Sequence, residues 1–118
     1  MKKSIITLCL VLGLLSANAS MAYFYLTGKV GEFSSHSLKR TDDWSGVSWF
    51  YLEGANIADF KQHCGLHNGK ALIAIYPQDT LVWTMVLQAK SQGSSIKVAI
   101  TNGRKIAGHC TVDSVDLL

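Results

Sequence analysis

Three histidines and two cysteines fall in two short segments of the chain and are its strongest candidates for chemistry. His63, Cys64 and His67 occupy one segment, and His109 and Cys110 the other. Imidazole nitrogens and thiolate sulfurs are the usual ligands of tetrahedral zinc, and a Cys-x-x-His pair combined with a distant His-Cys pair has a suitable composition. Neighbouring residues of a strand point to opposite faces, however, so His109 and Cys110 would not reach the same ion. We therefore expect no metal site.

Other catalytic patterns are missing from the sequence. It has no Gly-x-Ser-x-Gly nucleophile elbow, and a Cys64 nucleophile would compete with disulfide formation. Asp42 and Asp43 are adjacent in a polar stretch, which is typical of solvated carboxylates rather than of a glycosidase pair. We therefore expect a protein that is not an enzyme and needs no cofactor. A small hydrolase that uses the histidine cluster is the catalytic alternative.

The start of the chain has the three parts of a secretory leader. Two lysines follow the initial methionine, residues 5–15 form an apolar run, and residues 16–22 are mostly small. The apolar run is shorter than the roughly twenty residues that a membrane-spanning helix needs. We therefore expect residues 1–22 to be a cleaved signal peptide, with an uncleaved anchor as the alternative, and residues 23–118 to be periplasmic or secreted.

Removal of the leader changes the charge of what remains. Cleavage fits best after Ala22 or after Ala19, because a small residue also stands two positions before each. Nine basic residues then remain against eight acidic ones, so the net charge falls from +3 to +1. Because no basic cluster is left, we expect no nucleic-acid partner. The remaining length suits one small domain with one core. We expect no membrane span after cleavage.

The cysteines also change in number with the leader. Cys9 is lost, and Cys64 and Cys110 remain as an even pair in an oxidising compartment. A disulfide between them is the default expectation there. The bridge would close a loop of roughly forty-five residues and stabilise the folded state by about 4 kcal/mol on a chain-entropy model.

Short apolar stretches separated by polar turns make up the rest of the sequence. They predict strands at 23–33, 47–53, 70–76, 95–101 and 109–117, a polar loop at 34–46 and one helix between Pro77 and Gly93. Residues 56–67 fit either a short helical turn or a loop. Asn102-Gly103 is typical of a two-residue hairpin turn, and a change of apolar phase predicts a bulge near Asp113-Ser114. Three strands, a helix and two strands is the OB-fold order, so we expect a mainly β, OB-fold-like five-stranded Greek-key barrel with one helix.

Aromatic side chains are concentrated in the first third of the exported part of the chain: Tyr23, Phe24, Tyr25, Trp44, Trp49 and Tyr51. Such rings stack on sugars or fill protein interfaces, although they also build cores. A core role is the simpler expectation for Trp49 and Tyr51. Trp44 stands in the polar loop, where a core role explains it less easily. We take Trp44 and Trp49 as candidate ligand-binding residues.

Several short segments carry a resemblance to a known family: Thr27-Gly28-Lys29-Val30, residues 49–54, Cys64, the helix ending at Gly93, Ile96-Lys97-Val98 and the turn at Gly103. In these the chain resembles the pentameric B subunits of bacterial AB5 toxins, of the subtilase-cytotoxin and typhoid-toxin type. The resemblance implies an OB-fold, a homopentamer, a catalytic A subunit as partner and binding of sialylated glycans. The serine hydroxyl that this family uses in its first strand corresponds to Thr27, whereas Ile100 stands in place of the family's fourth-strand tyrosine.

These observations favour an exported, non-catalytic, OB-fold-like binding module. We expect it to recognise a glycan or another cell-surface ligand through Thr27, Trp44 and Trp49, and to carry the Cys64–Cys110 disulfide. The alternative is a monomeric periplasmic domain that binds or inhibits a protein partner.

Overall fold

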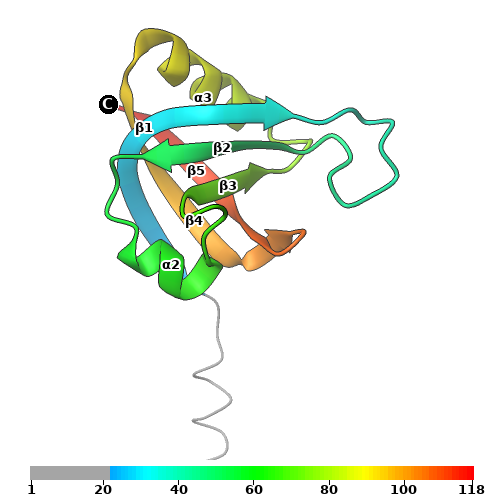
Figure 1. Cartoon of the computed structure of the whole chain (residues 1–118). Coiled ribbons are helices and arrows are strands. Elements are labelled where there is room, and N and C mark those ends of the chain that lie inside the picture. Colours follow the sequence, from blue (N-terminus) through cyan, green and yellow to red (C-terminus); the bar gives the residue numbers. More distant parts are fainter. Residues whose placement is uncertain (1–21) are drawn as a thin grey trace, which may run out of the picture.

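The computed structural model describes residues 22–118, so the leader expected at 1–22 lies outside the described residues except for Ala22. Five strands form a closed barrel in the order β1-β2-β3-β5-β4 (Figure 1). The elements are β1 (Tyr23–Ser35), β2 (Ser48–Glu53), α2 (Ala58–Cys64), β3 (Ala71–Ile75), α3 (Thr80–Gln92), β4 (Ser95–Ile106) and β5 (His109–Leu117). The predicted mainly β, OB-fold-like barrel is confirmed.

Strand β1 closes the barrel because it pairs with a different neighbour along each half. Its first half pairs antiparallel with β4, from Tyr23 opposite Thr101 to Lys29 opposite Ser95, and its second half pairs with β2. A methyl group at Gly28 would overlap the backbone carbonyl oxygen of Glu53, so only glycine allows β1 to cross β2 this closely. Among the described strands, the parallel contact joins β3 to β5, with Ala74 opposite Thr111.

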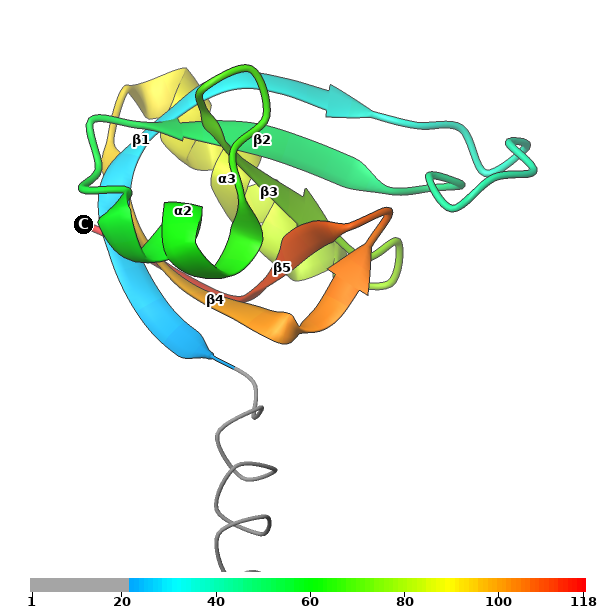
Figure 2. The same ribbon diagram turned by 60° about the horizontal axis from the view of Figure 1, so that its bottom comes forward.

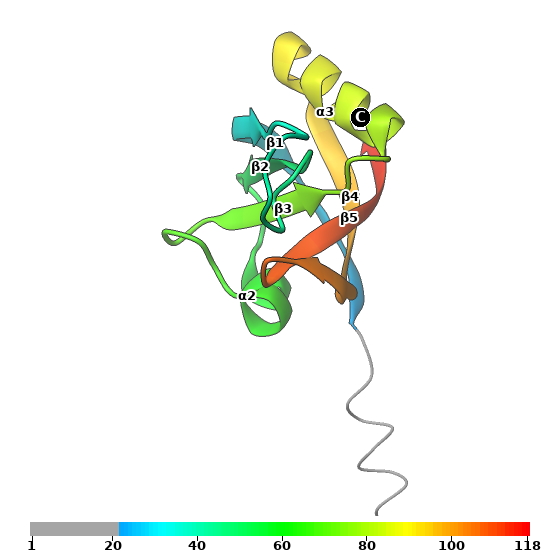
Figure 3. The ribbon, with the colours of Figure 1, turned by 90° about the vertical axis from the view of Figure 1, so that its right-hand side faces the viewer.

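The barrel interior is filled by the alternate apolar residues of the strands, and helices α2 and α3 close its opposite ends (Figure 3). Helix α3 contributes the fully buried Val86 and Ala89, and α2 contributes the buried Phe60. The strand residues of this core are Leu26, Val30, Phe50, Leu52, Ala71, Ile73, Ile75, Ile96, Val98, Ile100, Cys110, Val112 and Val115. In the strand predicted at 95–101, the three large aliphatic residues Ile96, Val98 and Ile100 all belong to this core.

Two local predictions are wrong. Within residues 22–118 there are two helices where one was expected, because residues 58–64, inside the stretch that fitted either a helical turn or a loop, form α2. Asn102-Gly103 does not form the hairpin turn: β4 continues to Ile106, and the turn lies at Ala107-Gly108, whose φ angles of 49° and 82° suit a two-residue hairpin turn. The bulge expected near Asp113 is confirmed, because Ala99 pairs with Ser114 while Ile100 pairs with Val112.

Candidate functional site

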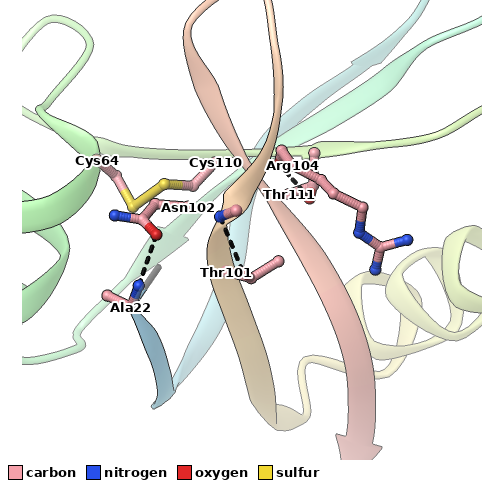
Figure 4. The surroundings of a disulfide bond; sticks show 8 residues. Ala22, Cys64, Thr101, Asn102, Arg104, Cys110 and Thr111 are labelled. Atoms are coloured by element: carbon pink, nitrogen blue, oxygen red, sulfur yellow. Dashed lines mark hydrogen bonds between the residues drawn. A yellow bond between two sulfur atoms is a disulfide. The ribbon is translucent and has the colours of Figure 1, made fainter. Parts of the chain in front are cut away.

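The predicted disulfide is present and joins α2 to the start of β5 (Figure 4). The Cα atoms of Cys64 and Cys110 are 5.5 Å apart, and the Cys110 side chain is fully buried. Both sulfurs are therefore committed to the bridge. Within residues 22–118, no group of three or more histidine, cysteine, aspartate or glutamate side chains is arranged to hold a metal ion.

Six aromatic and imidazole rings form a continuous row, here called the ring band, across the outside of the barrel. Successive ring centroids are 5.1–6.1 Å apart in the order Trp49, Tyr51, His67, His109, Trp44 and His36. The rings come from β2, from the loop before β3, from the start of β5 and from the β1–β2 loop. Figure 2 shows that this last loop and the tip of the β4–β5 hairpin lie on the same side of the barrel. The structure therefore brings Trp44 and Trp49 into one feature.

Trp44 has a structural role that the sequence did not reveal. Its half-buried side chain packs on a small outer cluster formed by Val47, Ala74 and Ile106, away from the barrel interior. Its ring also lies between those of His36 and His109. Trp44 therefore fastens the β1–β2 loop to the hairpin between β4 and β5.

The polar atoms of the ring band have partners of their own. The Tyr51 hydroxyl and His67 Nδ1 are 2.8 Å apart and share a hydrogen bond, and the Lys70 ammonium lies 5.1 Å from the centre of the Tyr51 ring. His36 Nδ1 lies 2.9 Å from the carbonyl oxygen of Val47, which requires the proton to be on Nδ1. These contacts order the rings and leave His67 exposed at the surface.

The position of His109 in the ring band lowers its pKa below the ordinary value of 6.5. Partial burial is the largest cause, because it disfavours the charged imidazolium, and repulsion by His67 and Lys105 adds to it. The unfolded chain therefore takes up a proton at His109 at a higher pH than the folded chain does. The contribution of neutral His109 to stability is present above about pH 6.5 and is lost as the pH falls toward the lower folded-state pKa.

We expect His109→Gln to flatten the dependence of stability on pH. In wild type the free energy of unfolding should fall between pH 7 and pH 5, and part of that fall should disappear in the variant, because glutamine does not titrate. Urea unfolding followed at several pH values measures both slopes. His63→Gln is the matched control, since His63 lies outside the ring band and packs near Phe24. An unchanged slope in His109→Gln would contradict the assignment.

Thr27 lies elsewhere, at the junction of two open hollows. One hollow of about 400 Å³, the Lys29 hollow, is lined by Thr27, Gly28, Lys29, Glu53, Gly54 and Ser95. The other, the Asp59 hollow of about 450 Å³, is lined by Tyr25, Leu26, Thr27, Asn56, Ala58 and Asp59. Both volumes fall in the range of small-molecule sites. Thr27 is the residue that these two linings share, and neither lining includes a member of the ring band.

Tyr25 is the exposed aromatic ring of these hollows, and sequence reasoning did not select it. Its side chain is 57% exposed, the Lys97 ammonium lies 5.0 Å from its ring centre, and the Tyr23 ring meets it edge-on at 5.8 Å. The signal was available in the alternation of β1, where Tyr23, Tyr25 and Thr27 share the outer face. An aromatic ring, a hydroxyl and the exposed Asp59 therefore face one open space.

Comparisons with family models, with curated proteins and with solved structures find no match for this chain. The described helices of residues 22–118 include none that is long and apolar enough to cross a lipid bilayer.

Proposed function

We propose that this protein is an exported, non-catalytic binding module that recognises a glycan at the two hollows around Thr27. The observation that carries the proposal is the sharing of Thr27 between hollows that also present an exposed tyrosine ring. Sugars offer an apolar face of C–H groups and a rim of hydroxyls. A binding site for them combines an aromatic surface with a few convergent polar groups.

Each group at the hollows has a chemical counterpart on a sugar. The Tyr25 ring would stack on a C–H face, while the Thr27 hydroxyl and the Asp59 carboxylate would exchange hydrogen bonds with sugar hydroxyls. Lys29 and Glu53 bring charges of both signs to the neighbouring hollow. An acidic substituent on the glycan would be attracted to Lys29, and a neutral sugar unit suits the Asp59 hollow.

The resemblance to AB5 toxin B subunits supports the same location, because Thr27 corresponds to the serine whose hydroxyl that family uses. The chain departs from the family at Ile100, whose side chain is fully buried in the barrel core and faces away from any ligand. We assign the aromatic contact to Tyr25 on β1 instead. Homopentamer formation and pairing with a catalytic A subunit belong to the proposal as partners that the resemblance implies.

Export of the protein is the second part of the proposal. The disulfide is stable in an oxidising compartment, and the amino-terminal residues have the composition of a cleaved leader. We infer a periplasmic or secreted location from these two features together.

Substitution at the hollows tests the glycan proposal. We expect the exported protein to bind members of an array of sialylated, sulfated and neutral glycans. Tyr25→Ala should weaken that binding about tenfold through loss of the stacking surface. Thr27→Val should weaken it about threefold to tenfold, because valine keeps the shape and removes the hydroxyl. Titration of the best array ligand by calorimetry measures both effects.

The controls separate this site from the rest of the surface. Thr41→Val removes a threonine hydroxyl in the β1–β2 loop, lines neither hollow and should leave affinity unchanged. Absence of binding across the whole array, or equal losses in Thr27→Val and Thr41→Val, would sink the proposal.

A monomeric protein-interaction or inhibitor domain is the second candidate function, and the ring band favours it. Tyrosine and tryptophan are enriched in protein interfaces, and Trp49 is half-buried at one end of the band. Native mass spectrometry distinguishes the two candidates by oligomeric state, because a pentamer fits the toxin-like module and a monomer fits the interaction domain. Trp49→Ala should abolish capture of a protein partner in the second case and leave glycan binding intact in the first.

A further inference from the structure

The chain contains two Asn-Gly pairs, Asn68-Gly69 and Asn102-Gly103. An asparagine that precedes glycine is open to self-modification, because the glycine has no side chain to hinder attack of its backbone nitrogen on the asparagine side-chain amide. The attack requires an amide that is able to turn toward this nitrogen and a nitrogen that is not engaged elsewhere. The two pairs are the same dipeptide, so a difference in their reactivity must come from the fold.

Asn68 and Gly69 are the central residues of a tight turn between α2 and β3. Their φ angles of 51° and 74° suit the type I′ turn that Asn-Gly favours. His67 and Lys70 close the turn through two backbone hydrogen bonds of 2.9 Å each. Asn68 and Gly69 are both exposed, and a methyl group added to Gly69 would meet no atom within 4 Å. Among the residues that the structure describes, none forms a hydrogen bond with the Asn68 side-chain amide or with the Gly69 N–H.

Asn102 and Gly103 lie where the β4–β5 ladder is interrupted, between Thr101 and Lys105, and both of their reacting groups are engaged. The Gly103 backbone N–H donates to Thr101 Oγ1 at 3.0 Å. The Asn102 side chain is directed toward the start of β1, where its Oδ1 accepts a hydrogen bond of 2.6 Å from the Ala22 backbone N–H (Figure 4). Attack of the glycine nitrogen on the Asn102 amide would break both hydrogen bonds.

We propose that Asn68 is a site of spontaneous modification, at which the side-chain amide becomes a carboxylate while the Asn102 amide is preserved. The Gly69 backbone nitrogen gives up its proton and bonds to the side-chain carbonyl carbon of Asn68. Ammonia leaves with that proton, and a cyclic imide remains. Water then opens the imide: attack on the side-chain carbonyl gives aspartate, and attack on the backbone carbonyl gives isoaspartate. Water and ammonia balance the reaction, and it depends on neither the proposed glycan nor the proposed export.

The modification would change the end of the ring band at His67, which belongs to the same turn. An aspartate at position 68 places a negative charge close in sequence to Lys70, whose ammonium lies 5.1 Å from the centre of the Tyr51 ring. Attraction to the new carboxylate would draw the ammonium away from that ring. Isoaspartate adds a methylene group to the backbone between His67 and Lys70, so the two backbone hydrogen bonds that close the turn would no longer fit. The modified protein therefore presents a different surface to a partner of the ring band.

Peptide mapping by mass spectrometry, after incubation of the folded protein in mildly alkaline buffer, tests the proposal. Each conversion replaces an NH₂ group with OH and raises the mass of the peptide that contains it. We expect Asn68 to be converted about tenfold faster than Asn102, which is the protection that two hydrogen bonds supply. After reduction and unfolding in guanidinium chloride, the two sites should react at similar rates, because only the shared dipeptide then governs them.

Thr101→Val tests the source of the protection at Asn102. Valine removes the acceptor of the Gly103 N–H, so the rate at Asn102 should rise about threefold to tenfold while the rate at Asn68 stays unchanged. An unchanged rate at Asn102 would contradict the assigned protection. In wild type, equal rates at the two sites of the folded protein would overturn the proposal. An Asn68 that stays intact in the folded protein, while the unfolded chain reacts at both sites, would also overturn it.

Discussion

Loss of the Cys64–Cys110 disulfide is expected to lower the free energy of unfolding by about 4 kcal/mol. The two cysteines are 46 positions apart, and their bond restricts the unfolded chain far more than the folded one. Typical domains have a total stability of only about 5–15 kcal/mol, so the loss is a large share of it. Urea unfolding of wild type and of the Cys64→Ala, Cys110→Ala double variant measures the difference.

Reduction of the wild-type protein supplies the control for this experiment. Reductant should move the unfolding midpoint of wild type close to that of the double variant and should leave the double variant unchanged. Equal midpoints for oxidised and reduced wild type would show that the bridge adds no stability and would contradict the expectation.

Phe50→Ala should cost about 3–5 kcal/mol of stability, because it empties the centre of the barrel. The Phe50 side chain is fully buried on β2 and lies in register with Ile73 of β3. Phe33 of β1 pairs with Phe50 across the strands but has a side chain that is 40% exposed. Phe33→Ala is therefore the matched control and should cost only about 1 kcal/mol.

Thermal and urea unfolding of both phenylalanine variants give the comparison. Phe50 lines neither hollow. Any loss of apparent glycan affinity in the Phe50 variant should therefore be explained entirely by its lower folded fraction. Similar losses of stability in the two variants would mean that the barrel interior is not the main source of stability.

The strands were predictable because apolar residues alternate along them with shorter or polar ones. Ile96, Val98 and Ile100 alternate with shorter or polar residues, and the structure buries all three. The alternation fails at Thr101 and Thr111, which are buried although each stands next to an inward-facing residue of its strand. Burial on both faces of a strand depends on tertiary contacts, which alternation does not report.

Asn102-Gly103 shows why a strong local signal can lose to a distant contact. The sequence of this pair fits a hairpin turn. In the structure, however, Asn102 Oδ1 accepts a hydrogen bond from the backbone N–H of Ala22, which lies 80 positions away in the chain. The turn moves to Ala107-Gly108, where an alanine adopts a positive φ of 49°. Helix α2 was ambiguous for a related reason, because Phe60 is its one fully buried residue and it has no side-chain cap.

The candidate site was predictable only in its parts. Thr27 was selected through the resemblance, and Trp44 and Trp49 were selected as aromatic residues. The sequence could not show that Thr27 lies at the hollows while the two tryptophans lie in the ring band. The hollows arise where β1 passes the end of β2 and the segment that leads into α2, so their linings combine residues from separate elements. The ring band likewise exists only because the β1–β2 loop folds back onto the β4–β5 hairpin.

The parallel contact between β3 and β5 affects the speed of folding. Ala74 and Thr111 are 37 positions apart along the chain, and pairing of distant parallel strands is slow because a long loop must close first. Cys64 precedes Ala74 by ten positions and Cys110 precedes Thr111 by one, so the disulfide offers a much shorter covalent path between the same two residues. The shorter path lowers the entropy cost of loop closure by about 1 kcal/mol. In the oxidised chain, β3 and β5 should therefore pair at a rate close to that of two segments that are near each other in the sequence.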